Sequence, residues 1–136
     1  MNSEPTPSVT SVIPGLPCSD MLFECLPTRA AGRAIGVARL NRPGALNALN
    51  LPMVQAMLSQ FRAWASDTSI VAVVLMGQGP KGFCAGGDVA EVVRQVRSGR
   101  PDRFVYGDAF FEVEYQLDML IHTYPKPFIT WAHGVD

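Results

Sequence analysis

Long apolar runs are missing from this 136-residue sequence. None reaches the roughly 18–20 residues that a membrane-spanning helix needs, so we do not expect a membrane as a partner. A strong charge of one sign is missing too, since the formal net charge is −1. No global field therefore favours binding to nucleic acid. Hydrophobic residues make up 48% of the chain, which is enough to form the packed core of one domain.

Cysteine is scarce, with three residues at positions 18, 25 and 84 and no CxxC motif. The odd number and irregular spacing argue against both a disulfide framework and a zinc site. A secretory signal is also missing from 1-MNSEPTPSVTSVIPGLP-17, which contains no Arg or Lys. A mitochondrial transit peptide is expected to be rich in Arg. These absences predict a reducing compartment and a cytoplasmic location.

The first 19 residues are rich in proline, serine and threonine, which predicts a flexible tail over residues 1–19. Residues 20–136 then form the predicted domain. The segments 21-MLFECL-26 and 33-RAIGVARL-40 favour strands, and 27-PTRAAG-32 between them indicates a β-hairpin.

Helices and strands alternate in the rest of the chain. Asn50 is a suitable N-cap, and apolar residues then recur at helical spacing. The valine-rich run 70-IVAVVLM-76 predicts a parallel strand buried on both faces. A helix after Asp88, a helix over about 104–122 and a strand over 128–132 follow. The order β-β-α-β-α-α-β predicts an α/β fold.

The loop after the apolar run contains 77-GQGPKG-82, which matches the G-x-G-x-x-G pattern of dinucleotide-binding proteins. That pattern requires its third glycine inside a helix that starts at the loop. Here Pro80 interrupts the loop, and Gly86 and Gly87 fall where the helix would continue. A Walker A loop fails as well, because no Lys-Ser or Lys-Thr pair follows Gly82.

The segment 82-GFCAGGD-88 offers another interpretation. Its small residues let a ligand approach the main chain, and their N–H groups precede a predicted helix, where negative charge is favoured. Such a turn can stabilise an oxyanion without a side chain. An ordinary glycine-rich turn between a strand and a helix explains the same residues.

Other polar residues have a functional and a structural explanation. Cys84 could be a nucleophile or a small buried thiol. His122 and His133 could act as bases or bind a metal, but their spacing is not that of metal ligands. Asp88 could be a catalytic acid or a helix N-cap.

Glu112 and Glu114 flank Val113 on a predicted helix that is rich in aromatic residues. One of these carboxylates could face a cleft, and both could equally be solvated.

A family resemblance rests on two motifs and their separation. The segments 40-LNRPGALNAL-49 and 70-IVAVVLMGQGPKGFCAGGDV-89 resemble the enoyl-CoA hydratase/isomerase (crotonase) superfamily over residues 21–136. The form FCAGGD, together with 110-FFEVEYQLDMLIHTYPKPFITWAHG-134, is most similar to the 3-hydroxyisobutyryl-CoA hydrolase branch. The resemblance implies an N-terminal part of a crotonase-like fold with repeated β-β-α units.

The resemblance also implies a site for an acyl-CoA thioester. The implied positions are Ala45, Leu46, Ala48, Ala85, Gly86, Gly87, Asp88, Val89 and Glu114. In the family, main-chain groups around 45–48 contact the adenine end of coenzyme A. Ala85 would supply one N–H of the oxyanion hole. Gly86 and Gly87 follow it and, without side chains, leave the main chain accessible to the substrate.

The same resemblance assigns the walls of the site. Asp88 and Val89 would line the pantetheine channel, and Glu114 would lie near the acyl pocket. Coenzyme A would be part of the substrate, so no separate cofactor and no metal are expected. A homo-oligomer is left open.

The family's second oxyanion donor and its catalytic carboxylates lie beyond the position of 133-HGVD-136. The resemblance therefore implies an N-terminal fragment that ends inside its active site, with little activity and with an exposed apolar edge at strand 128–132. The predicted function is thioester hydrolysis in valine catabolism. A hydratase or isomerase, or a non-enzymatic module that binds coenzyme A or another subunit, are the alternatives.

Overall fold

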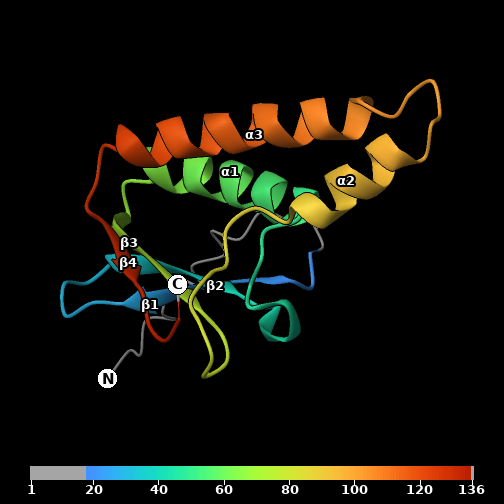
Figure 1. The fold of residues 1–136 in the computed structure, drawn as a ribbon. Helices are drawn as coiled ribbons and strands as arrows, with labels where there is room; N and C mark the ends of the chain where they lie inside the picture. The colour runs from blue at the N-terminus through green and yellow to red at the C-terminus, as the bar shows by residue number, and fades with distance from the viewer. Residues whose placement is uncertain (1–17, 136) are drawn as a thin grey trace.

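The computed structural model describes residues 18–135 of the chain. Its elements are β1 (Met21–Pro27), β2 (Ala34–Leu40), the 3₁₀ turn η1 (Pro43–Ala45), α1 (Leu51–Ser66), β3 (Ile70–Gly77), α2 (Val89–Arg97), α3 (Val105–His122) and β4 (Phe128–Trp131) (Figure 1). This order confirms the predicted β-β-α-β-α-α-β pattern. The predicted tail over residues 1–19 lies outside the described residues except for Cys18, which packs against the core, and Ser19.

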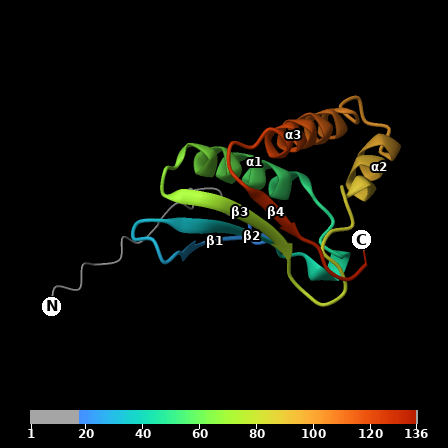
Figure 2. The same cartoon turned by 90° about the vertical axis from the view of Figure 1, so that its left-hand side faces the viewer.

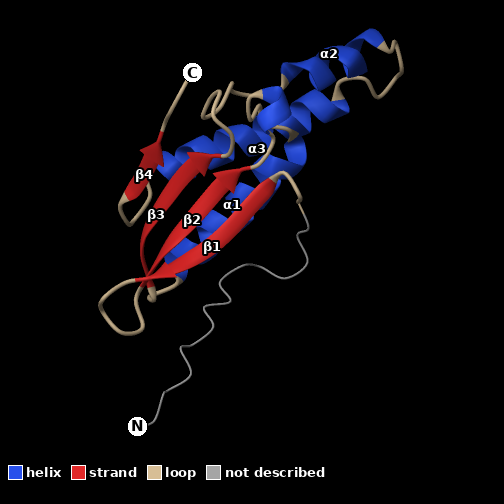
Figure 3. Cartoon of the chain, turned by 90° about the horizontal axis from the view of Figure 1, so that it is seen from below, coloured by secondary structure: helices blue, strands red, loops and turns tan. Residues whose placement is uncertain are grey.

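The four strands form one sheet in the order β1-β2-β3-β4. β1 and β2 form the predicted antiparallel hairpin, whereas β2–β3 and β3–β4 are parallel pairs. The helices all lie on one side of this sheet, as the view from below shows (Figure 3). α1 lies directly on the sheet and α3 lies above α1, so the fold is layered as sheet, helix and helix (Figure 2).

α1 forms where the sequence provides both a cap and an apolar face. The Asn50 side chain accepts a hydrogen bond of 3.0 Å from the Met53 N–H, which satisfies one free donor of the first turn. Trp64 is fully buried near the other end of the helix and packs against β2. A Cβ placed on Gly36 would lie 2.7 Å from the Trp64 ring, so this contact requires a glycine in the strand.

The segment between α3 and β4 is anchored to the last turn of α1. The Tyr124 hydroxyl donates a 2.6 Å hydrogen bond to the Phe61 carbonyl, and the Lys126 ammonium bonds the carbonyls of Trp64 and Asp67. The negative end of the helix dipole also stabilises a cation near these carbonyls. The Tyr-Pro-Lys-Pro segment therefore joins two layers of the fold.

β3 is parallel to both of its neighbours, as predicted, but its burial on both faces is not observed. Val73 and Leu75 face α1 and are buried, whereas Val74 and Met76 on the opposite face are only half-buried. The prediction was wrong because, among residues 18–135, the helices cover only one side of the sheet (Figure 3). No helix in this described part is long and apolar enough to cross a membrane.

The last strand, β4, lies at the edge of the sheet. Ile129 and Trp131 belong to the uncovered face and are 49% and 64% exposed. This agrees with the predicted apolar edge, which leaves unpaired backbone groups beside apolar side chains.

Candidate functional site

Two loops that are distant in the sequence meet at one end of the sheet. The Ala85 N–H donates to the Leu46 carbonyl at 2.9 Å, and the Leu49 N–H donates to the Gly86 carbonyl at 2.8 Å. A third hydrogen bond, of 2.7 Å, joins the Asp88 N–H to the Leu49 carbonyl. The two motifs that carried the family resemblance therefore form one surface, with its backbone fixed from both sides.

A buried asparagine, Asn47, holds this surface together. Its amide donates to the carbonyls of Gln78 and Gly82 at 2.9 and 3.1 Å, and its carbonyl oxygen accepts from the Arg42 N–H at 2.8 Å. The backbone of Asn47 is in the left-handed region with φ of 56°, which asparagine tolerates better than most residues. One side chain thus connects three segments.

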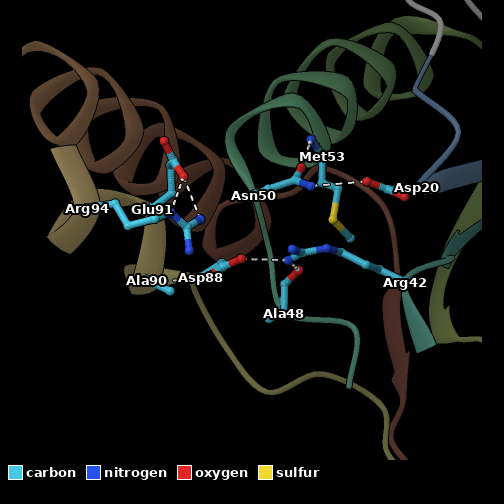
Figure 4. A network of polar contacts seen from close by, with 9 residues as sticks. All are labelled: Asp20, Arg42, Ala48, Asn50, Met53, Asp88, Ala90, Glu91 and Arg94. Carbon is cyan, nitrogen blue, oxygen red and sulfur yellow. Dashed lines mark hydrogen bonds and ion pairs between the residues drawn. The ribbon is translucent and has the colours of Figure 1, made fainter. Parts of the chain in front are cut away.

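Asp88 is held by an ion pair with Arg42 (Figure 4). The Arg42 Nη1 lies 2.8 Å from the Asp88 carboxylate and 3.0 Å from the Ala48 carbonyl oxygen. The Asp88 carboxylate also accepts from the Ala90 N–H, so Asp88 is the N-cap of α2. The hydrogen bond from Arg42, followed by that from Ala90, holds the pKa of Asp88 below its ordinary value.

Ala85, the predicted oxyanion donor, has its N–H in a hydrogen bond within the protein. The Ala85 N–H already donates to the Leu46 carbonyl, and the Gly86 N–H lies 3.3 Å from the Cys84 sulfur. Among the hydrogen bonds of residues 18–135, none has the Gly87 N–H as its donor. The Gly87 N–H, one residue before the cap of α2, is therefore available to a ligand.

Glu114 on α3 lies beside Gly87. A Cβ placed on Gly87 would lie 3.1 Å from Glu114 Oε1, so the carboxyl group borders the space that a side chain at position 87 would occupy. Glu114 is half-buried, and burial, with a smaller effect of the Asp118 carboxylate, raises the pKa of Glu114. Its neighbour Glu112 is exposed. The open choice between the two glutamates is thereby resolved, because only Glu114 faces the loop.

The remaining candidates have structural surroundings. Cys84 is half-buried and packs against the core. The Nε2 of His133 lies 2.7 Å from the Gly79 carbonyl oxygen, so this nitrogen carries a proton. His122 is an exposed residue in the last turn of α3. In the described part of the chain, no group of three or more His, Cys, Asp or Glu residues could hold a metal ion.

The main-chain N–H groups of the 45–48 turn donate to carbonyls of residues 42–45. The Ala48 N–H donates to the Ala45 carbonyl at 3.0 Å, and the Leu46 N–H donates to the Pro43 carbonyl at 3.1 Å. The Leu46 side chain is exposed, and so is Val89 at the start of α2. The predicted contacts of Ala45, Leu46, Ala48 and Val89 with coenzyme A stay predictions.

Arg42 and Asn47 are the site residues that the sequence did not reveal. Both lie within 40-LNRPGALNAL-49, so the motif itself was the signal. Their roles depend on contacts with residues 31 to 46 positions away, and no local pattern predicts such pairs.

The model of one protein family, described as enoyl-CoA hydratase/isomerase, matches residues 35–136. This match covers well over half of the chain, so the protein belongs to the enoyl-CoA hydratase/isomerase family. The predicted incomplete crotonase-like α/β fold is confirmed by a solved enoyl-CoA hydratase from Rhodobacter sphaeroides, which superposes with a TM-score of 0.75 at 36% identity. The superposition covers 85% of this chain and 32% of that structure.

Curated relatives carry a hydrolase name. A "3-hydroxyisobutyryl-CoA hydrolase, mitochondrial" from Xenopus tropicalis is 42% identical over 112 residues, which is 82% of this chain and 28% of the relative. The protein of the same name from Danio rerio is 38% identical over 117 residues, covering 86% of this chain and 28% of the relative. This chain therefore spans less than a third of the length of these relatives.

The predicted cytoplasmic location is contradicted by these comparisons, because both curated relatives are named as mitochondrial. The prediction depended on the absence of Arg and Lys from residues 1–17, which the structure does not describe. That absence was not sufficient evidence for a compartment.

Proposed function

We propose that this chain supplies the carbonyl-polarising half of an acyl-CoA thioester hydrolase site of the 3-hydroxyisobutyryl-CoA type. The single observation that carries the proposal is the unpaired N–H of Gly87, held by the two family motifs beside the start of α2. The hydrolase names of relatives at 42% and 38% identity support the substrate class.

The chemistry follows from where negative charge develops. Attack on a thioester places negative charge on the carbonyl oxygen, and an N–H within about 3 Å stabilises that charge. The N-terminus of α2 adds a favourable dipole at the same place. One such donor is worth about 2.7–4 kcal/mol of transition-state stabilisation. Gly87 takes this role in place of Ala85, whose N–H is already paired.

The rest of the substrate would extend along the paired loops. The 45–48 turn would contact the adenine end of coenzyme A, and the backbone at Gly86, Asp88 and Val89 would line the pantetheine channel. Because the Asp88 carboxylate is paired with Arg42, its part is to hold the channel wall. Glu114 would face the acyl group.

A hydrolase site also needs a second oxyanion donor and a group that activates water. We place both in the part of the relatives' sequences that lies outside the segment matched by this chain. Hydrolysis needs both, since removal of a general base or nucleophile costs orders of magnitude in rate. The 136-residue chain is therefore expected to bind a thioester and to turn it over slowly.

An enoyl-CoA hydratase or isomerase is the second candidate function. It is favoured by the 36% identity to the solved protein described as an enoyl-CoA hydratase. The same N–H would stabilise the enolate of an unsaturated thioester. The non-enzymatic candidate, a module for coenzyme A binding or subunit association, is favoured by the exposed edge at Trp131.

A set of assays separates these functions. The chain is titrated by calorimetry with a 3-hydroxyacyl-CoA and with the free hydroxy acid, and thiol release is followed with a chromogenic disulfide. Binding of the thioester with slow thiol release supports the proposal. Addition of water to crotonyl-CoA without thiol release favours the hydratase. Absence of binding to any coenzyme A ester contradicts both enzymatic functions.

A further inference from the structure

α3 is the outer layer of the fold, and its outward face carries an apolar stripe (Figure 2). Phe111, Tyr115 and Met119 follow one another at intervals of four residues, which places them on one side of the helix. All three are exposed, so no other element among residues 18–135 covers them. An apolar stripe on a helix normally packs against another element, and this α3 stripe has none within the described chain.

The charges that α3 places beside this stripe are negative. Residues 104–125 contain no Lys or Arg, and they contain four acidic residues. Glu112 and Asp118 are exposed, and each is three residues from Tyr115, so they flank the stripe. Neither carboxylate has a side-chain hydrogen bond or ion pair among the described residues. The α3 stripe therefore fits an apolar partner surface that carries positive charge.

α2 and the loop after it form such a surface, and they extend past the end of the sheet (Figure 1). None of the residues of α2 is fully buried. Three of its valines are exposed on one side of the helix: Val89, Val93 and Val96. Arginines recur at every third position from Arg94 to Arg103. Residues 89–103, which we call the α2 segment, therefore form a basic amphipathic surface.

Part of this positive charge is not used within the chain. The two acidic residues of the α2 segment are each paired with an arginine, Glu91 with Arg94 and Asp102 with Arg100. Arg103 lies over the Phe104 ring. Arg97 has no side-chain hydrogen bond or ion pair in the part of the chain that the structure describes. Four arginines against two acidic residues leave the segment with a net charge of +2.

We propose that the α2 segment of one copy of this chain docks on the α3 stripe of a second copy. The exposed valines would cover the stripe, and Arg97 would meet Glu112 and Asp118 of the second copy. Two α3 stripes do not fit each other, because these carboxylates would come together beside a single cation, Arg62 of α1, which already bonds Gln116. Since one chain holds both surfaces, the contact can form in both directions, as in a symmetric dimer.

Docking would affect the candidate site as well as the assembly. α2 begins two residues after Gly87 and has no fully buried residue, so its own chain holds it weakly. A second copy would supply the apolar contacts that α2 lacks. The inference goes beyond the proposed function and is independent of the thioester chemistry.

Charge reversal tests the pairing, with sedimentation equilibrium at low salt as the measurement. The α2 variant is Arg97→Glu/Arg100→Glu, and the α3 variant is Glu112→Arg/Asp118→Arg. All four side chains are exposed, so neither variant disturbs the core. We expect each variant to weaken association about tenfold or more, because like charges then meet across the contact.

Two further substitutions make the measurement specific. Trp131→Lys is present in every chain, so that the exposed sheet edge does not contribute to association. Arg29→Glu is the matched control, because Arg29 is exposed in the hairpin turn between β1 and β2. We expect this control to leave the association unchanged.

The decisive measurement mixes the α2 variant with the α3 variant. An equimolar mixture is expected to recover association, because every contact in the mixed pair joins opposite charges. A mixture that stays monomeric overturns the inference. A parent chain that is monomeric at its highest soluble concentration does so too, as does association that neither reversal changes.

Vesicles test the other occupant that a basic amphipathic helix could have. Binding of the parent chain to vesicles of anionic phospholipid, with no dimer in solution, would assign the α2 segment to a lipid surface and overturn the inference. None of these measurements involves coenzyme A, so a failed thioester-binding experiment bears only on the proposed function.

Discussion

The Arg42 guanidinium and the Asp88 carboxylate lie 2.8 Å apart and join two loops that are 46 residues apart in the sequence (Figure 4). The same Arg42 nitrogen also donates to the Ala48 carbonyl. Both side chains are mostly shielded from solvent, with relative exposures of 29% and 16%. The backbone that presents the Gly87 N–H is thus held by the ion pair of the residue that follows it.

Substitution of Arg42 by methionine is expected to weaken this connection. Loss of the charged hydrogen bonds leaves the Asp88 carboxylate without its partner, at a cost of about 1.5–3 kcal/mol in the free energy of unfolding. Arg94→Met is the matched control, because Arg94 is largely exposed and its ion pair with Glu91 should contribute little. Urea unfolding measures both variants. Equal losses in the two would show that the Arg42 pair has no special role.

The stability of the fold should fall in acid because of Asp88. Its folded-state pKa is lowered by Arg42, so the unfolded chain takes up the proton first as pH falls. The contribution is complete above the ordinary aspartate pKa of about 3.9 and is lost as pH falls through the lowered folded value. Asp88→Asn keeps an N-cap but removes the charge. The difference in unfolding free energy between wild type and Asp88→Asn should therefore shrink with acid, and a constant difference would contradict the assignment.

Tyr124 should make stability depend on pH at the alkaline end. Burial raises the pKa of Tyr124 to about 12, above the ordinary value near 10. The unfolded chain loses the phenolic proton first, so this contribution is present below about pH 10 and is lost as pH rises toward the folded value. Tyr124→Phe removes the hydrogen bond to the Phe61 carbonyl, at a cost of about 0.5–1.5 kcal/mol.

Ultraviolet titration of the folded wild type should show one late-ionising tyrosine that is absent in Tyr124→Phe. Tyr106 also has a pKa raised mainly by burial, so the comparison between the two proteins is essential. An unchanged late phase in Tyr124→Phe would assign that phase to another residue.

The exposed edge of the sheet should promote self-association. Trp131 is 64% exposed on β4, where backbone groups are also unpaired. Trp131→Lys is expected to reduce light scattering and sedimenting material by introducing a charge at that edge. Val105→Lys is the control, since Val105 is 65% exposed on α3, away from any strand edge. Equal effects of both substitutions would indicate general solubilisation.

Local patterns were sufficient for most of the fold. The Asn50 cap and the apolar spacing that follows it predicted α1, and the segments flanking residues 27–32 predicted the hairpin. These signals are short-range, because a helix or hairpin is specified by neighbouring residues. The burial of β3 was mispredicted because burial on its second face depends on what else covers the sheet.

The site was predictable only in part. The motifs and the resemblance indicated the loop 82–88 and Glu114, but they assigned the donor to Ala85. Its N–H is taken by the Leu46 carbonyl, and this hydrogen bond depends on how the two loops meet in space. The position of Glu114 beside Gly87 likewise depends on the packing of α3 beside the loop, which spacing along the chain does not encode.

The most direct test of the account follows individual backbone amides during binding. The ¹⁵N-labelled chain is titrated with a 3-hydroxyacyl-CoA and with coenzyme A alone. The account predicts that the Gly87 amide proton shifts strongly with the thioester and little with coenzyme A, while the paired Ala85 amide changes less. A dominant shift at Ala85, or no shift anywhere in residues 85–88, would contradict it.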